Sequence, residues 1–112
     1  MNVLFIVLNE TDYLDEILDA FVEIGVKGAT ILDSQGMGSA ITNSGRGKEP
    51  FFGGIRSFLE NARPYNKTIF TVIEGEYLLQ QAINTVKNIV GDMSKPGVGL
   101  MFSLPVGNIY GM

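Results

Sequence analysis

Cysteine and histidine are both absent from the chain. A protein without thiols has neither a disulfide framework nor a cysteine nucleophile. Without imidazole it lacks the commonest general base, and a zinc or iron site would have to use oxygen ligands alone. No serine has a candidate base partner in the sequence, so nucleophilic catalysis has no visible machinery. We therefore expect a protein with no catalytic residues and no metal site.

Basic residues and long apolar runs are also scarce. Eight Lys and Arg residues against twelve Asp and Glu residues give a net charge of -4. A nucleic-acid binder normally carries excess positive charge, so we expect no nucleic-acid partner. No apolar run approaches the roughly 20 residues that span a bilayer, and the apolar residues 3–8 lack the basic flank of a signal peptide. We expect a cytoplasmic protein that is not inserted in a membrane.

Hydrophobic residues, by contrast, make up 46% of the 112 residues, and charged residues only 18%. This composition predicts a buried core, and the length predicts a single domain over residues 1–112. Helical spacing of apolar residues predicts two helices, the first capped by Thr11 and ended by Gly25, the second ended by Gly91. Apolar and β-branched runs predict four strands, at residues 3–8, 29–33, 68–73 and 99–106.

These elements form a weak internal repeat. Phe-Ile-Val-Leu at 5–8 precedes Tyr-Leu at 13–14, and Phe-Thr-Val-Ile at 70–73 precedes Tyr-Leu at 77–78. Two β-α-β units predict an α+β fold, a ferredoxin-like βαββαβ sandwich with a four-stranded antiparallel sheet. Its first and third strands would be central, Pro105 would lie on an edge strand, and both helices would cover one face. Because the central strands are apolar on both faces, a closed homo-oligomer would bury the other face.

A long loop, residues 36–66, joins the second and third predicted strands. Loops of this length are usually functional or disordered, and this one is rich in glycine and locally cationic in an acidic protein. We expect residues 38–53 to be mobile without a ligand and residues 54–64 to contain a short helix. A solvated insertion is the alternative. The charged and aromatic residues of the loop that we expect to contact a partner are Arg46, Lys48, Phe51, Phe52 and Arg56.

Two glycine-containing motifs are similar to those of a known family. Gly-Val-Lys-Gly-Ala-Thr-Ile at 25–31, followed by Gly-Met-Gly at 36–38, resembles the PII signal-transduction (nitrogen regulatory protein) family. In that family the second strand has Gly-(Ile/Val)-x-Gly-Met-Thr-Val and ends in Gly-Phe-Gly. Lys-Pro-Gly-Val-Gly-Leu-Met-Phe at 95–102 resembles the family's nucleotide-binding B-loop, Lys-Ile-Gly-Asp-Gly-Lys-Ile-Phe. Residues 39–66 fall where the family has its T-loop.

The resemblance implies a ferredoxin-like trimer that binds nucleotides in clefts between subunits. It also implies a T-loop that inserts into a target transporter or enzyme. By position, Thr30 would lie near the nucleotide base. The residues that would form the base of the T-loop are Gly36, Met37 and Gly38, and those of the phosphate-side B-loop are Lys95, Gly97, Val98 and Gly99.

The chain departs from the family pattern at several charged positions. The second B-loop lysine is Leu100, and an apolar side chain does not stabilise a triphosphate. The Lys-Pro after the first strand is Asn9-Glu10, and the Arg-Gln that serves metal and 2-oxoglutarate binding is Ser39-Ala40. The family's C-terminal arginines have no counterpart. These departures predict a divergent PII-like protein that does not sense ATP and 2-oxoglutarate by the standard route.

The leading hypothesis is therefore a non-enzymatic PII-like regulatory trimer. It would bind a small anionic ligand, for which a nucleotide is one candidate, and signal to a protein partner through its long loop. A small enzyme on the same fold and a CutA-like trimeric metal-tolerance protein are the alternatives. The missing nucleophile–base pair disfavours the enzyme, and the absence of His and Cys disfavours the metal protein. The sequence names neither the ligand nor the target.

Overall fold

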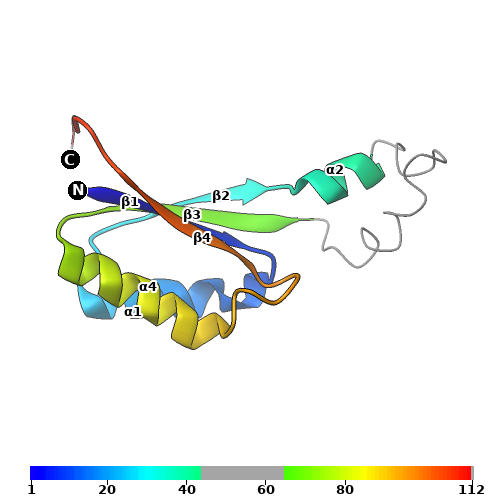
Figure 1. The fold of residues 1–112 in the computed structure, drawn as a ribbon, viewed down its shortest axis with the longest axis horizontal. Coiled ribbons are helices and arrows are strands. Elements are labelled where there is room, and N and C mark those ends of the chain that lie inside the picture. Colours follow the sequence, from blue (N-terminus) through cyan, green and yellow to red (C-terminus); the bar gives the residue numbers. More distant parts are fainter. Residues whose placement is uncertain (44–64, 112) are drawn as a thin grey trace.

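The computed structural model describes residues 1–43 and 65–111. The strands of this part form one antiparallel sheet in the order β2-β3-β1-β4, and α1 and α4 lie together on one of its faces (Figure 1). This confirms the predicted ferredoxin-like arrangement, with the first and third strands in the centre. The elements in chain order are β1 (Asn2–Leu8), the 3-10 turn η1 (Thr11–Tyr13), α1 (Leu14–Ile24), β2 (Thr30–Ser34), α2 (Met37–Asn43), β3 (Asn66–Ile73), α4 (Glu76–Val90) and β4 (Gly99–Pro105).

The strand register fixes which residues share a face of the sheet. β1 pairs along its whole length with β3, from Asn2 opposite Ile73 to Leu8 opposite Lys67, and with β4 on its other side. β2 pairs only with β3. β2 and β4 are therefore the edge strands, and Pro105, which has no N–H to donate to a ladder, lies on an edge as predicted.

The core lies between the sheet and the two helices. Leu4, Ile6 and Leu8 of β1 are fully buried because alternate residues of a strand point to the same face. The helices contribute apolar side chains at helical spacing. These are Ile17 and Phe21 from α1, and Leu79, Ala82, Val86 and Val90 from α4.

The structure confirms the predicted end of α1 but not its predicted start. Gly25 ends the helix as expected: its φ is 98°, and its N–H donates to Val22 at 3.2 Å. Thr11 is wrong as the cap. It is the first residue of η1, and α1 begins at Leu14 with no side-chain cap bond. The reason is that backbone bonds of the tight turn replace the cap, since the Leu14 N–H donates to the Thr11 carbonyl.

The sheet face opposite the helices is apolar, and no helix or strand of the described residues covers it (Figure 1). We call it the open face, and it carries the other alternating set of β1, namely Val3, Phe5 and Val7. The Phe5 ring stacks on Phe102 of β4 at a centroid distance of 5.0 Å and lies 5.7 Å from that of Phe70 of β3. The remaining apolar residues of the open face, placed there by register, are Leu32, Val72, Leu100 and Leu104.

The segment between β2 and β3 begins with a helix that the sequence analysis did not predict. α2 starts at Met37, and the Ala40 N–H donates to the Gly36 carbonyl at 3.0 Å in its first turn. The mobility expected from residue 38 stays a prediction. The predictions for the rest of the segment lie outside the described residues. They include the mobility up to residue 53, the short helix in 54–64 and the partner contacts of Arg46, Lys48, Phe51, Phe52 and Arg56. Within the described ranges, no helix has the length and hydropathy needed to cross a bilayer.

Candidate ligand-binding site

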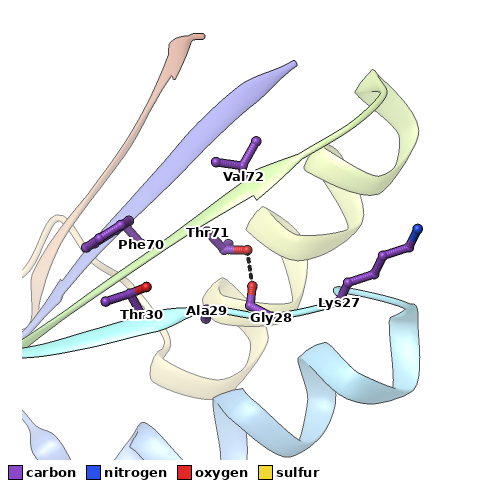
Figure 2. A pocket seen from close by; sticks show the side chains of 7 residues that line it. All are labelled: Lys27, Gly28, Ala29, Thr30, Phe70, Thr71 and Val72. Carbon is purple, nitrogen blue, oxygen red and sulfur yellow. Dashed lines mark hydrogen bonds between the residues drawn. The ribbon is translucent and has the colours of Figure 1, made fainter. Parts of the chain in front are cut away.

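A cavity of about 330 Å³ opens where the chain joins β2 (Figure 2). The ladder between β2 and β3 begins at the pair of Thr30 and Phe70, so the residues before Thr30 diverge from β3. The Thr71 hydroxyl donates to the Gly28 carbonyl at 2.5 Å and fixes the diverging chain to β3. The residues that line the cavity are Lys27, Gly28, Ala29, Thr30, Phe70, Thr71 and Val72.

The cavity offers a different chemistry at each end. Phe70 and Thr30 lie side by side at one end, and Lys27 lies at the other (Figure 2). Among the described residues that line it, Lys27 is the one charged residue and none carries a carboxylate, although the chain has a net charge of -4. Small-molecule sites are typically apolar with a few polar groups that fix orientation. This lining fits a small molecule with an apolar or planar body and a negatively charged group.

The loop between α4 and β4, residues 91–98, carries the B-loop-like motif. The Asp92 carboxylate accepts hydrogen bonds from the Ser94 hydroxyl at 2.6 Å and from the Ser94 N–H at 2.9 Å. These bonds, that of the hydroxyl first, hold the pKa of Asp92 below its ordinary value because they stabilise the ionised carboxylate. At the other end of the loop, the Asn9 N–H donates to the Val98 carbonyl at 3.4 Å. The loop is thus attached to the end of β1.

Gly99 has a structural role that requires no ligand. Its φ is 150°, and a Cβ at this position would lie 2.2 Å from the Val7 carbonyl oxygen. Since Gly99 pairs with Leu8 at the first position of β4, the close approach of β1 excludes any side chain. The glycine predicted to contact phosphate is therefore explained by strand pairing alone.

A group of hydrogen-bonded polar residues lies at the same end of the sheet. We call Asn9, Ser34, Asn66 and Thr68 the polar cluster. The Ser34 hydroxyl donates to Asn66 Oδ1 and lies 2.7 Å from the Thr68 hydroxyl, and Asn66 Nδ2 donates to Asn9 Oδ1 at 3.4 Å. Asn66 is only 8% exposed. A Cβ added at Gly36 would lie 3.8 Å from Asn66 Nδ2, so the turn after β2 lies beside the cluster.

The residues predicted from the sequence fall in separate parts of this structure. Thr30 lines the cavity. Gly36, Met37 and Gly38 follow β2 at one edge of the sheet, whereas the 95–99 motif precedes β4 at the other edge. Two strands lie between them, which corresponds to roughly 14 Å at the usual strand spacing. A single chain therefore does not bring all the predicted residues together.

Several lining residues were missed by the sequence analysis. Phe70 and Val72 were assigned only to a strand, because their position beside Thr30 depends on the register between β2 and β3. Lys27 lay within the motif at 25–31 and could have been singled out as a cation beside the predicted ligand. Nothing in the sequence indicated that the side chain of Asn66 is buried, since its burial results from packing at the sheet end. Within the described ranges, no group of three or more acidic residues could hold a metal ion.

Comparison with known proteins gives a fold but no family assignment. No protein-family model matches the chain, and no curated protein matches its sequence. Among solved structures, it is similar to the crystal structure of Arabidopsis thaliana PII bound to citrate, with a TM-score of 0.62 and 18% sequence identity. The match covers 94% of this chain and 76% of that protein. At this identity the likeness establishes that the chain has the fold of a PII protein.

Proposed function

We propose that the protein is a non-enzymatic PII-like regulator that acts in the cytoplasm as a homotrimer. It binds a small anionic ligand in clefts between subunits and signals to a protein target through residues 39–66. The observation that carries this proposal is the apolar open face, which extends from the edge strand β2 to the edge strand β4. The sequence motifs and the PII-like fold support the same assignment.

The open face favours assembly on energetic grounds. Leu100 is 58% exposed and Leu104 47% exposed, and Phe102 is exposed to a similar extent. Full burial of one such side chain stabilises by roughly 1.5–3 kcal/mol, so burial of the exposed parts of these three gives roughly 3 kcal/mol per copy. A soluble monomer rarely leaves a contiguous apolar face of this kind uncovered.

Assembly also accounts for the separation of the candidate site residues. In a closed ring each copy uses one edge against the opposite edge of its neighbour. The cavity at Thr30 and the Gly36 turn lie beside the β2 edge, and the 95–99 motif lies beside the β4 edge. A neighbouring copy would therefore supply the part of the site that one chain lacks.

The ligand that fits best is a small anion with few charges. By their positions, Lys27 in the cavity and Lys95 in the loop are the cations that could bind such an anion. Leu100 stands where the resemblance places a phosphate-binding lysine, so a triphosphate is disfavoured. Citrate in the Arabidopsis PII structure is an example of a small anion on this fold.

A thermal-shift screen tests the proposal. Citrate, mono-, di- and triphosphate nucleotides and cyclic dinucleotides are added to the full chain, and a true ligand raises the Tm in a concentration-dependent way. Lys27→Met should reduce that rise, whereas Lys87→Met, which removes a lysine from α4 away from the cavity, should leave it unchanged. If no compound raises the Tm, or if both variants respond alike, the cavity is not the ligand site.

A further inference from the structure

The polar cluster forms a continuous chain of hydrogen bonds across the sheet end. It starts at Ser34, the last residue of β2, and passes to Asn66, the first residue of β3. Asn66 continues it to the Asn9 side chain, just after β1. The Asn9 main-chain N–H then donates to Val98, just before β4. One chain of contacts thus connects the ends of all the strands of the described sheet.

The two asparagines hold this chain of contacts together. The side chain of Asn66 is almost buried, with its Oδ1 bonded toward β2 and its Nδ2 bonded toward Asn9. A buried amide left without partners costs free energy, so Asn66 keeps these contacts together. Asn9 bonds toward β3 with its side chain and toward the loop with its main chain. It is therefore the junction between residues 91–98 and the base of α2.

We propose that Asn9 and Asn66 are positioning residues that couple the loop at 91–98 to the Gly36 turn, from which α2 starts. Both bonds of Asn9 measure 3.4 Å, which is longer than the usual 2.7–3.2 Å, so they are the weakest bonds in this chain of contacts. A displacement at one end of the chain of contacts would therefore change these two bonds first and, through them, the other end. Its regulatory meaning rests on the proposed function, but the coupling itself needs no ligand.

The same contacts also suit a purely structural role, in which each bond only satisfies its own buried group. The two roles differ in how far a perturbation travels. In a structural cluster, removal of the Ser34 hydroxyl affects Asn66 and Thr68 alone. In a coupled cluster the same substitution also changes the surroundings of Val98, which is on the far side of β3 and β1. This change at Val98 requires the Asn9 side chain.

Amide chemical shifts of the ligand-free full chain decide between these roles. Ser34→Ala should shift the amide resonances of Asn9 and Val98 beyond the spread seen for core residues such as Val86. In the Asn9→Ala background the same substitution should leave Val98 unshifted. Asn108→Ala, an exposed asparagine beyond β4, is the matched control and should shift neither resonance.

Two outcomes overturn the coupling. One is a Val98 resonance that Ser34→Ala does not move, and the other is a shift of Val98 that persists without the Asn9 side chain. A double-mutant cycle by urea unfolding gives a second measurement. Ser34 and Asn9 share no direct bond, so non-additive losses of stability support the link through Asn66, and additive losses contradict it.

Discussion

At Gly99 the close approach of β1 leaves no space for a side chain. We predict that Gly99→Ala lowers the free energy of unfolding by roughly 2 kcal/mol or more, because the new Cβ would meet the Val7 carbonyl and the φ of 150° would be strained. Gly107→Ala is the control, since nothing lies within 4 Å of its Cβ position and its φ is not in the strained range. Urea unfolding of both variants measures the difference, and equal stabilities would contradict the prediction.

The pKa of Asp92 provides a test of the hydrogen bonds that hold the loop. We predict that Ser94→Ala raises the pKa of Asp92 toward its ordinary value, because the hydroxyl bond is lost while the bond from the backbone N–H remains. This lowered pKa makes the stability of the fold depend on pH. A lowered folded-state pKa stabilises the fold above the unfolded-state pKa, and that contribution is lost as the pH falls through the folded-state value.

An NMR titration of the Asp92 carboxyl between pH 2 and pH 6 gives the measurement. Ser103→Ala on β4 is the matched control and should leave the titration of Asp92 unchanged, because Ser103 makes no bond to this carboxyl. An unchanged pKa in Ser94→Ala would mean that the loop does not hold this turn in solution. The loop would then offer no fixed backbone to a ligand.

At the scale of the elements, the start of α1 gives the next prediction. A true N-cap residue contributes about 1 kcal/mol, and its replacement by alanine loses that amount. Thr11 instead uses its main-chain carbonyl, which alanine retains, so Thr11→Ala should change the free energy of unfolding by less than about 0.5 kcal/mol. Chemical denaturation measures this value. A loss near 1 kcal/mol would restore Thr11 as the cap.

What the sequence could predict at this scale depends on how local the determining contacts are. The alternation along β1 and the end of α1 at Gly25 were predictable, since each depends on residues a few positions apart. The cavity beside Thr30 was not, because it depends on the point where β2 leaves β3. The polar cluster was not either, since Asn9, Ser34 and Asn66 are far apart in the sequence and meet only through sheet order.

At the scale of the whole molecule, one arrangement would explain both the open face and the separation of the candidate site residues. If copies of the chain assemble with their open faces inward, the apolar faces become buried and neighbouring copies bring the separated residues together. The polar cluster then borders the interface, because Ser34, Asn66 and Thr68 share the face of Phe70 by register. The apolar face would bind the copies together, and the polar end would lie beside the clefts between them.

The assembly itself is testable with a matched pair of charges. We predict a trimer at micromolar concentration in sedimentation velocity, converted to smaller species by Leu104→Lys on the open face. Val22→Lys introduces the same charge on α1, at a side chain that is 74% exposed, and should leave the trimer intact. A monomeric parent chain would contradict the intersubunit cleft. If both variants dissociate, the added charge alone causes the dissociation and the position on the open face does not matter.

The last prediction concerns the charge of the ligand. A charge-assisted hydrogen bond contributes roughly 1.5–3 kcal/mol, and each 1.4 kcal/mol is about tenfold in affinity. With Leu100 in place of a lysine, ATP should bind the parent chain at millimolar affinity or not at all. Leu100→Lys should strengthen ATP binding about tenfold or more in molecules that remain trimeric, because residue 100 lies at the end of the open face beside the 95–99 motif. Sedimentation velocity of the same sample shows whether the trimer survives this charge. Calorimetry with Val22→Lys as the control separates this local gain from a change in net charge. Micromolar ATP affinity in the parent chain would contradict the prediction, and equal affinities in the two lysine variants would show that residue 100 does not contact the phosphates.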